Sequence, residues 1–309
     1  MTLRIGTRGS DLALWQARRV AGLLRHRLGL DARLEVIKTK GDRVQDVAFR
    51  KMEGKGFFTK ELQEALLDDR VDLVVHSLKD LPTEEAPGLR VAAIPERSNP
   101  ADLLLARRGL VARSAEDPLG LPQGAVLGTS SLRRAAQALA HTPELTIRAL
   151  RGNVPTRIGK LRAGDYDAIL VAAAGVGRLD LDLSDLDAVE LSPDVMLPAP
   201  GQGALAIETR RDDEVGRAVE ALHDDDLAAG IRAERGLLAL LGGGCHLPLG
   251  CLACRDSGGI RLQAVLGTID DDATSATVAR VGAVAPTADL AARACFEALR
   301  ATAGPEEPA

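Results

Sequence analysis

The chain has 309 residues, with 39 lysines and arginines against 44 aspartates and glutamates, which gives a formal net charge of −5. Apolar residues make up 46% and the mean hydropathy is zero, so the chain is neither disordered nor collagen-like. Aromatic residues are only 2%, and the charge is negative, which argues against a nucleic-acid-binding protein. The length predicts about two domains, with three small domains or one large barrel still open.

Neither the start of the sequence nor its interior predicts export or membrane insertion. Residues 1–14 alternate apolar and charged side chains, unlike a secretory signal, and no apolar run approaches the ~18 residues of a membrane span. All cysteines fall in the last quarter of the chain: Cys245, Cys251, Cys254 and Cys295. We therefore expect a protein of the reducing cytoplasm rather than a secreted, disulfide-stabilised one.

Taken in chain order, the predicted elements begin with a strand at residues 3–7, a loop, and a helix whose N-cap is Ser10. The same order returns at residues 125–139, where a Gly-Thr strand end is again followed by serine and a helix.

A second repeated pattern follows in each half. A helix at 58–69 leads into a strand at 71–75, and a helix at 157–163 leads into a strand at 166–171. Each strand is unbroken apolar after its aspartate, which is typical of a strand buried on both faces of a parallel sheet. The pattern predicts two similar doubly wound α/β lobes with a ligand cleft, although two unrelated α/β segments can share it by chance.

Breaker-rich stretches at 95–100 and 197–203 are the predicted crossings between the lobes. After residue 212 the pattern changes to that of a small α+β domain that carries every cysteine. Its predicted elements are a helix at 224–241, strands at 260–266 and 276–284, and a helix at 288–301. The polar tail 304–309 is expected to fray.

Arginines recur in the loops or first helical turns that follow strands. They are Arg8, Arg133, Arg134, Arg151, Arg157 and Arg178. In a protein of negative net charge this group predicts a ligand with carboxylates or phosphates, assisted by Ser10, Ser131 and nearby helix N-termini. For any single arginine, a solvated helix face is the alternative.

The stretch 76–82 follows a buried strand at its carboxyl end. Asp80 beside Lys79 can stay ionised, and could stabilise a developing cation or move protons; a turn aspartate is the alternative. The charged stretch 41–56 has glycines at both ends and predicts either a mobile lid or a surface loop without function. It lacks the spacing of a phosphate-binding Walker loop.

Three glycines at 242–244 precede Cys245 and His246, and Cys251 and Cys254 follow. Three thiols and an imidazole could bind zinc, but the first pair lacks the usual two-residue gap. The alternatives are a reactive or covalently loaded thiol at Cys245, which the glycines would allow into a cleft, or a merely buried cysteine.

Together these pieces resemble the porphobilinogen deaminase family over nearly the whole chain. The matching stretches are 4–10, 12–17, 54–62, 76–82, 128–134, 151–157, 200–204 and 243–250. Several such motifs in the family's order are a highly specific match.

The resemblance implies three domains, the first two similar to each other and to the periplasmic-binding-protein (type II) fold. Domain 1 would comprise residues 1–96 and 201–220, domain 2 residues 97–200, and the small α+β domain 3 residues 221–309. It also implies a transferase of heme and tetrapyrrole biosynthesis that condenses four porphobilinogen units head to tail, releases ammonia and yields hydroxymethylbilane. The implied cofactor is a dipyrromethane held by a thioether to Cys245.

The resemblance assigns roles residue by residue. Asp80 would be catalytic, stabilising the azafulvenium cation that remains when ammonia leaves. The implied cofactor-binding residues are Cys245, Lys79, Ser77, Thr129, Ser131, Arg133 and Arg134, and the substrate-binding residues are Arg8, Ser10, Phe58, Arg151, Arg157, Arg178 and Gln202. No metal is expected. The expected partner is the small molecule porphobilinogen, with no nucleic acid and no membrane, and the chain is expected to be a monomer.

The sequence departs from the family pattern at His246, where glutamine is usual, at Gly242, where an acidic residue is frequent, and at Gly9. Two rival interpretations remain. A two-lobed anion-binding protein would use the same arginine loops but have no use for Asp80 or Cys245. A zinc-stabilised α/β protein would require stoichiometric metal.

Overall fold

The computed structural model describes residues 2–39, 59–114, 117–244, 247–270 and 272–302. The chain forms two compact units: Met1–Ser98 with Gln202–Ala228, and Asn99–Gly201 with Ala229–Ala309. Several sequence predictions lie outside the described residues: the stretch 41–56, Phe58, the pair Cys245 and His246, and the tail 304–309.

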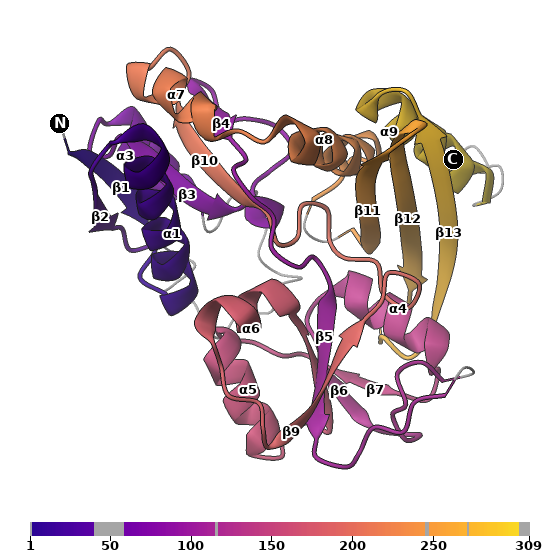
Figure 1. Ribbon diagram of the computed structural model, residues 1–309. Helices are drawn as coiled ribbons and strands as arrows, with labels where there is room; N and C mark the ends of the chain where they lie inside the picture. The colour runs from indigo at the N-terminus through magenta and orange to yellow at the C-terminus, as the bar shows by residue number, and fades with distance from the viewer. Residues whose placement is uncertain (1, 40–58, 115–116, 245–246, 271, 303–309) are drawn as a thin grey trace. The chain divides into compact units, whose positions relative to one another are not determined.

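The first unit contains one five-stranded sheet, called lobe 1, in the order β2-β1-β3-β10-β4. Its strands are β1 (Leu3–Thr7), β2 (Ala32–Val36), β3 (Leu73–Ser77), β4 (Leu89–Ala93) and β10 (Leu205–Arg210). Strands β2, β1 and β3 run parallel, whereas β10 lies antiparallel between β3 and β4 (Figure 1). The chain therefore supplies lobe 1 with a strand that comes about 130 residues after β3.

Helices cover both faces of lobe 1. Helix α1 (Asp11–Leu28) packs Ala17, Val20 and Leu24 against one face, and α3 (Lys60–Leu67) packs Leu62 and Leu66 against the other. The remaining helical segments are η2 (Leu78–Asp80), α7 (Glu214–Val219) and η3 (Glu220–Leu222).

Helix α1 begins where the sequence predicts. The Ser10 side chain accepts a hydrogen bond from the Ala13 amide at 3.4 Å, and the helix ends at Gly29, whose φ of 68° suits glycine. The predicted N-cap is confirmed.

The second unit contains lobe 2, a five-stranded sheet in the order β7-β6-β8-β5-β9. Its elements are β5 (Asp102–Arg107), β6 (Val126–Gly128), α4 (Leu132–His141), β7 (Thr146–Arg148), α5 (Val154–Arg162), β8 (Ala168–Ala172), α6 (Ala173–Leu179) and β9 (Leu186–Leu191). Three strands are again parallel, and β5 lies antiparallel between β8 and β9. This is the topology of lobe 1, with the antiparallel strand supplied from earlier in the chain instead of later.

The second unit also holds a three-stranded antiparallel sheet of β11 (Leu249–Asp256), β12 (Gly259–Ile269) and β13 (Ala276–Ala285). Helices α8 (Asp225–Leu240) and α9 (Ala288–Thr302) share an apolar core with one face of this sheet (Figure 1). The other face contacts α4 of lobe 2, where glycines let the two surfaces approach closely. The predicted fold class, α/β with two similar lobes and a small α+β part, is confirmed.

In the described part of the chain, no helix is both long enough and apolar enough to cross a bilayer.

Candidate functional site

In each lobe, several of the site residues predicted from sequence lie where the parallel strands end. In lobe 1, Arg8 and Ser10 follow β1, and Ser77 is the last residue of the neighbouring strand β3, which Lys79 and Asp80 follow. In lobe 2, Thr129 follows β6, and Ala172 at the end of β8 pairs with Asp102. Ligands of open α/β sheets bind at this edge, because strand ends and helix N-termini meet there.

Asp80 lies on a single helical turn, η2, which begins directly after β3. The Leu78 amide donates a hydrogen bond to Ala204 O at 3.0 Å, and the Leu81 amide donates to Leu78 O at 3.1 Å, which closes the turn. Asp80 is exposed, whereas Lys79 is half-buried and donates to Gln202 Oε1 at 3.4 Å. The turn therefore presents the carboxylate outward while the adjacent ammonium is held by a buried amide.

Three polar side-chain contacts involve the last two residues of β3, which precede this turn, or their partner Glu208. Gln16 of α1 donates to Ser77 Oγ at 2.7 Å. His76 Nε2 lies 2.9 Å from Glu208 Oε2, and Gln63 of α3 donates to Glu208 Oε1 at 2.8 Å. Of these residues, sequence reasoning gave a role to Ser77 alone. A signal existed for Glu208, because a single acidic residue inside the apolar strand β10 implies a buried partner.

Lobe 2 contains a buried ion cluster, which we call the Asp102 triad: Asp102, Arg133 and Arg134. Asp102 Oδ2 accepts from Arg133 Nη1 at 2.5 Å, and Asp102 Oδ1 accepts from Arg134 Nε and Nη2 at 3.1 and 2.7 Å. All three side chains are at least nine-tenths buried.

Burial alone would raise the pKa of Asp102, but the charges and hydrogen bonds of the two arginines hold that pKa well below its usual value. Burial also disfavours the charged form of Arg134 and so lowers its pKa, an effect that the charge of Asp102 opposes. With both guanidiniums charged, the triad carries a net charge of about +1.

The start of α4 completes this part of lobe 2. Ser131 is its N-cap residue, and the Ser131 side chain makes no capping bond. Its amide instead donates to Thr129 Oγ1 at 3.1 Å. A helix N-terminus beside a net positive cluster is a favourable place for a carboxylate.

The other predicted arginines of lobe 2 lie on different elements. Arg151 is half-buried in the loop before α5, and Arg157 of α5 donates through Nε to Gly152 O at 2.8 Å. Arg178 is buried on α6. Gln202, predicted to bind substrate, is fully buried beside Lys79 in lobe 1.

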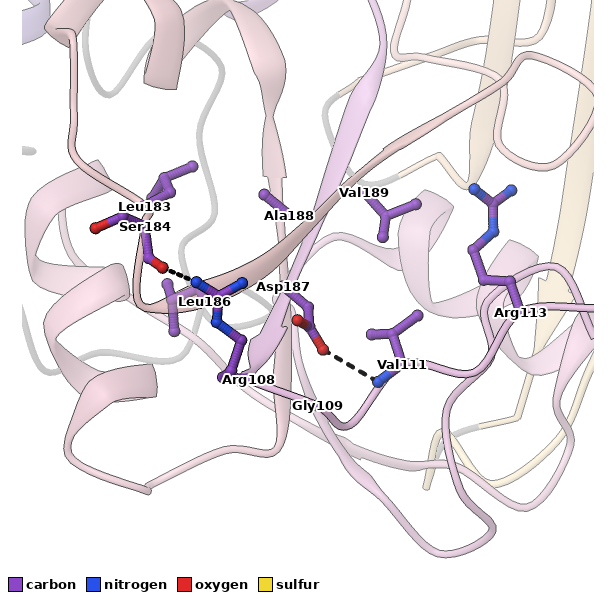
Figure 2. A pocket seen from close by; sticks show the side chains of 10 residues that line it. All are labelled: Arg108, Gly109, Val111, Arg113, Leu183, Ser184, Leu186, Asp187, Ala188 and Val189. Carbon is purple, nitrogen blue, oxygen red and sulfur yellow. Dashed lines mark hydrogen bonds between the residues drawn. The ribbon is translucent and has the colours of Figure 1, made fainter.

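An open hollow of about 660 Å³ lies at the other edge of lobe 2, between the end of β5 and the start of β9 (Figure 2). Figure 2 shows its polar groups joined to one another: Arg108 donates to Ser184 O, and Asp187 accepts from the Val111 amide. None of the predicted site residues lines it.

Two of the four residues of the zinc hypothesis, Cys245 and His246, lie outside the described residues, so the structure does not test it. Among the described residues, no three histidine, cysteine or acidic side chains form a metal-binding group. Cys251 is buried and Cys254 is exposed. Positions three apart on a strand face opposite sides, so these two thiols are poorly placed to share one ion.

Two family models match the chain: "Porphobilinogen deaminase, dipyromethane cofactor binding domain" over residues 3–218, and "Porphobilinogen deaminase, C-terminal domain" over residues 228–298. The chain belongs to the porphobilinogen deaminase family. The porphobilinogen deaminase of Maridesulfovibrio salexigens is 47% identical over 270 residues, which covers 87% of this chain and 85% of the relative. That of Acidothermus cellulolyticus is 45% identical over 309 residues, covering 97% and 89%.

Among solved structures, an ancestral cationic amino acid solute binding protein matches with a TM-score of 0.43 and 15% identity, covering 72% of this chain and 87% of its own. The Bordetella pertussis BvgS periplasmic VFT2 domain gives 0.43 and 13%, covering 74% and 90%. These scores are too low to bear on function.

Family membership makes the chain an enzyme, a transferase of tetrapyrrole biosynthesis that carries a dipyrromethane cofactor. The site residues fit such a group, which combines carboxylates with pyrrole N–H donors. Buried Arg133 Nε makes no hydrogen bond to the described residues, and a ligand carboxylate would supply its partner. Asp80 is an exposed carboxylate, a group of the kind that can accept hydrogen bonds from pyrrole N–H groups.

Proposed function

We propose that this chain condenses four porphobilinogen units head to tail, with release of ammonia, to give hydroxymethylbilane. The observation that carries the proposal is the match of both parts of the family model, over residues 3–218 and 228–298. Positive charge in lobe 2 and an exposed carboxylate in lobe 1 support it, because porphobilinogen combines carboxylates with a centre that becomes cationic.

The arginine and serine positions hold carboxylates in this proposal. The residues that would hold the cofactor are Ser77, Lys79, Thr129, Ser131, Arg133, Arg134 and Cys245, the last through a thioether. Those that would hold porphobilinogen are Arg8, Ser10, Phe58, Arg151, Arg157, Arg178 and Gln202. Guanidinium groups suit this task, since they form paired hydrogen bonds with carboxylates and stay charged when buried.

Asp80 is the proposed catalytic residue. When porphobilinogen loses ammonia, the ring nitrogen supplies electrons to the carbon left behind, and a cation spreads over the pyrrole. The Asp80 carboxylate would accept a hydrogen bond from the pyrrole N–H and stabilise the positive charge of the ring. Lys79, bonded to Gln202 Oε1, is held beside the carboxylate. When bound, the dipyrromethane supplies the pyrrole carbon on which the chain starts.

The proposal also covers the division into domains, the oligomeric state and the location of the chain. The chain divides into domain 1 (1–96 and 201–220), domain 2 (97–200) and domain 3 (221–309), with the cofactor cysteine in domain 3. It acts as a monomer in the cytoplasm, on a small-molecule substrate, without nucleic acid or membrane.

The test is the intact mass of the denatured, purified protein. We expect a covalent excess equal to two linked pyrrole units, which a Cys245→Ser variant lacks and a Cys254→Ser variant keeps. Cys254 is the matched control because it is an exposed thiol on β11.

An unmodified mass would be followed by incubation with porphobilinogen and a second measurement. A chain that stayed bare would refute the proposal and favour the two-lobed anion-binding protein. An excess retained by Cys245→Ser would refute the attachment point alone.

A further inference from the structure

The Asp102 triad has an unequal distribution of hydrogen bonds. All three nitrogens of Arg134 donate within the chain: Nε and Nη2 to Asp102, and Nη1 to Leu170 O at 2.9 Å. Arg133 is held through Nη1 alone, which donates to Asp102 and to Leu197 O at 2.8 Å. Arg134 is thus locked by its surroundings, whereas Arg133 is anchored at one corner.

The unanchored side of Arg133 is the Nε side. Its Nε is buried and has no hydrogen-bond partner among the described residues. A buried N–H without a partner has lost its hydrogen bonds to water and gained none in return, so it calls for an acceptor that a ligand can supply. Asp102 therefore does more than neutralise charge: it fixes which edge of Arg133 is left for a ligand.

The position of Asp102 supports this. It opens β5, and its backbone pairs with Ala172 at the carboxyl end of β8, the edge where an open sheet receives ligands. Its side chain is fully buried, so it contacts the two arginines and not solvent.

The net charge of the triad also limits how many ligand carboxylates it binds. Two guanidiniums and one carboxylate leave about one positive charge, which one ligand carboxylate neutralises. Without Asp102, two buried guanidiniums would repel each other, and Arg134 would lose the acceptor of two of its hydrogen bonds.

We propose that Asp102 is a positioning residue, which locks Arg134, turns the Nε edge of Arg133 toward the ligand, and sets this subsite to bind a single carboxylate of the oligopyrrole. The proposal rests on the proposed function, since the ligand is the cofactor that the arginines would hold.

The experiment measures how fast cofactor-free full-length protein gains the covalent mass after porphobilinogen is added. The variants are Asp102→Asn, Arg133→Gln and their double variant. The matched control is Asp72→Asn, which removes another buried, arginine-paired carboxylate at the opposite edge of lobe 1. Circular dichroism at the assay temperature confirms that each protein is folded.

Each single variant is expected to load about ten-fold more slowly or worse, since each loses charge-assisted hydrogen bonds. If Asp102 acts through Arg133, the double variant loads no more than about three-fold more slowly than Arg133→Gln, because the first change has already removed the interaction. Asp72→Asn should stay within about two-fold of the unmodified chain.

Additive effects in the double variant would overturn the positioning of Arg133 by Asp102, and normal loading by Asp102→Asn would overturn the positioning of both arginines. If Asp102→Asn does not fold, Asp102→Glu replaces it: this variant keeps the charge but shifts the carboxylate by about 1.5 Å, and normal loading by it would overturn the role equally. An unmodified chain that gains no mass refutes the proposed function, and this inference with it.

Discussion

Helix α4 carries Arg133 and Arg134 and also contacts the three-stranded sheet, so a change at that contact should reach the proposed site. Gly267 of β12 faces α4 there: a Cβ at this position would lie 2.5 Å from the Cβ of Ala136 and 3.5 Å from that of Pro248. We therefore predict that Gly267→Ala destabilises the second unit and slows cofactor loading, although the residue touches no ligand.

The magnitude follows from the contact distance. Two carbon atoms in ordinary contact lie about 3.5–4.0 Å apart, so α4 and β12 must separate by about 1 Å or more. Overpacking of this kind costs about 1–3 kcal/mol. For a unit of this size we expect Tm to fall by roughly 4–8 °C for a cost of about 2 kcal/mol. A misplacement of about 1 Å at the arginines can cost up to a hundred-fold in rate.

The assay combines thermal unfolding, followed by circular dichroism, with the intact-mass loading rate. Ala136→Gly removes the opposing Cβ at a helix cost of about 1 kcal/mol, so Gly267→Ala with Ala136→Gly should be more stable than Gly267→Ala alone. Gly282→Ala on β13 is the matched control, since its Cβ would meet only Leu262 O at 3.6 Å. Normal stability and loading in Gly267→Ala, or no relief from Ala136→Gly, would refute the reasoning.

Two further predictions concern titration. Burial tends to raise the pKa of Asp72, but hydrogen bonds and charge from Arg4 outweigh burial, so this pKa is lowered. The ionised Asp72 therefore stabilises the fold above an aspartate's unfolded pKa of about 3.9, and this stabilisation is lost as the pH falls through the folded pKa. The difference in unfolding free energy between wild type and Asp72→Asn, measured in urea at several pH values, should therefore shrink below about pH 4, and a constant difference would contradict the pairing. Burial raises the pKa of the Cys295 thiol to about 11, so in the native protein an alkylating reagent should modify Cys254 and spare Cys295. Peptide mass mapping measures the labelling of each thiol. Equal labelling of Cys295 before and after unfolding would contradict this prediction.

Local signals were sufficient to predict many of the elements. The strand at residues 3–7 coincides with β1, and the last predicted helix, 288–301, is α9 (Ala288–Thr302). Both are marked by periodicity and by capping or turn residues within a few positions. The repeated halves were visible because both lobes build their parallel strands from the same strand-loop-helix order.

Non-local pairing was not predictable in the same way. Strands β5 and β10 enter each lobe antiparallel, and nothing in their own residues specifies the neighbour with which they pair. Asp102 lies 31 and 32 residues from its arginines, so sequence reasoning grouped Arg133 with Arg134 as equal ligand residues and missed the carboxylate between them. Only the hydrogen bonds reveal that Arg134 is locked and Arg133 is not.

The placement of the two important carboxylates follows one electrostatic rule. A carboxylate held against arginines is neutralised by them, as Asp102 is, and has little charge left to stabilise a cation. The proposed catalytic carboxylate, Asp80, is kept from such partners: it is exposed on its turn and forms no ion pair within the described residues. The ammonium of its neighbour Lys79 is hydrogen-bonded to Gln202. In our proposal, the Asp80 carboxylate on lobe 1 stabilises the cationic centre of the substrate, and the Asp102 triad on lobe 2 offers positive charge to a carboxylate.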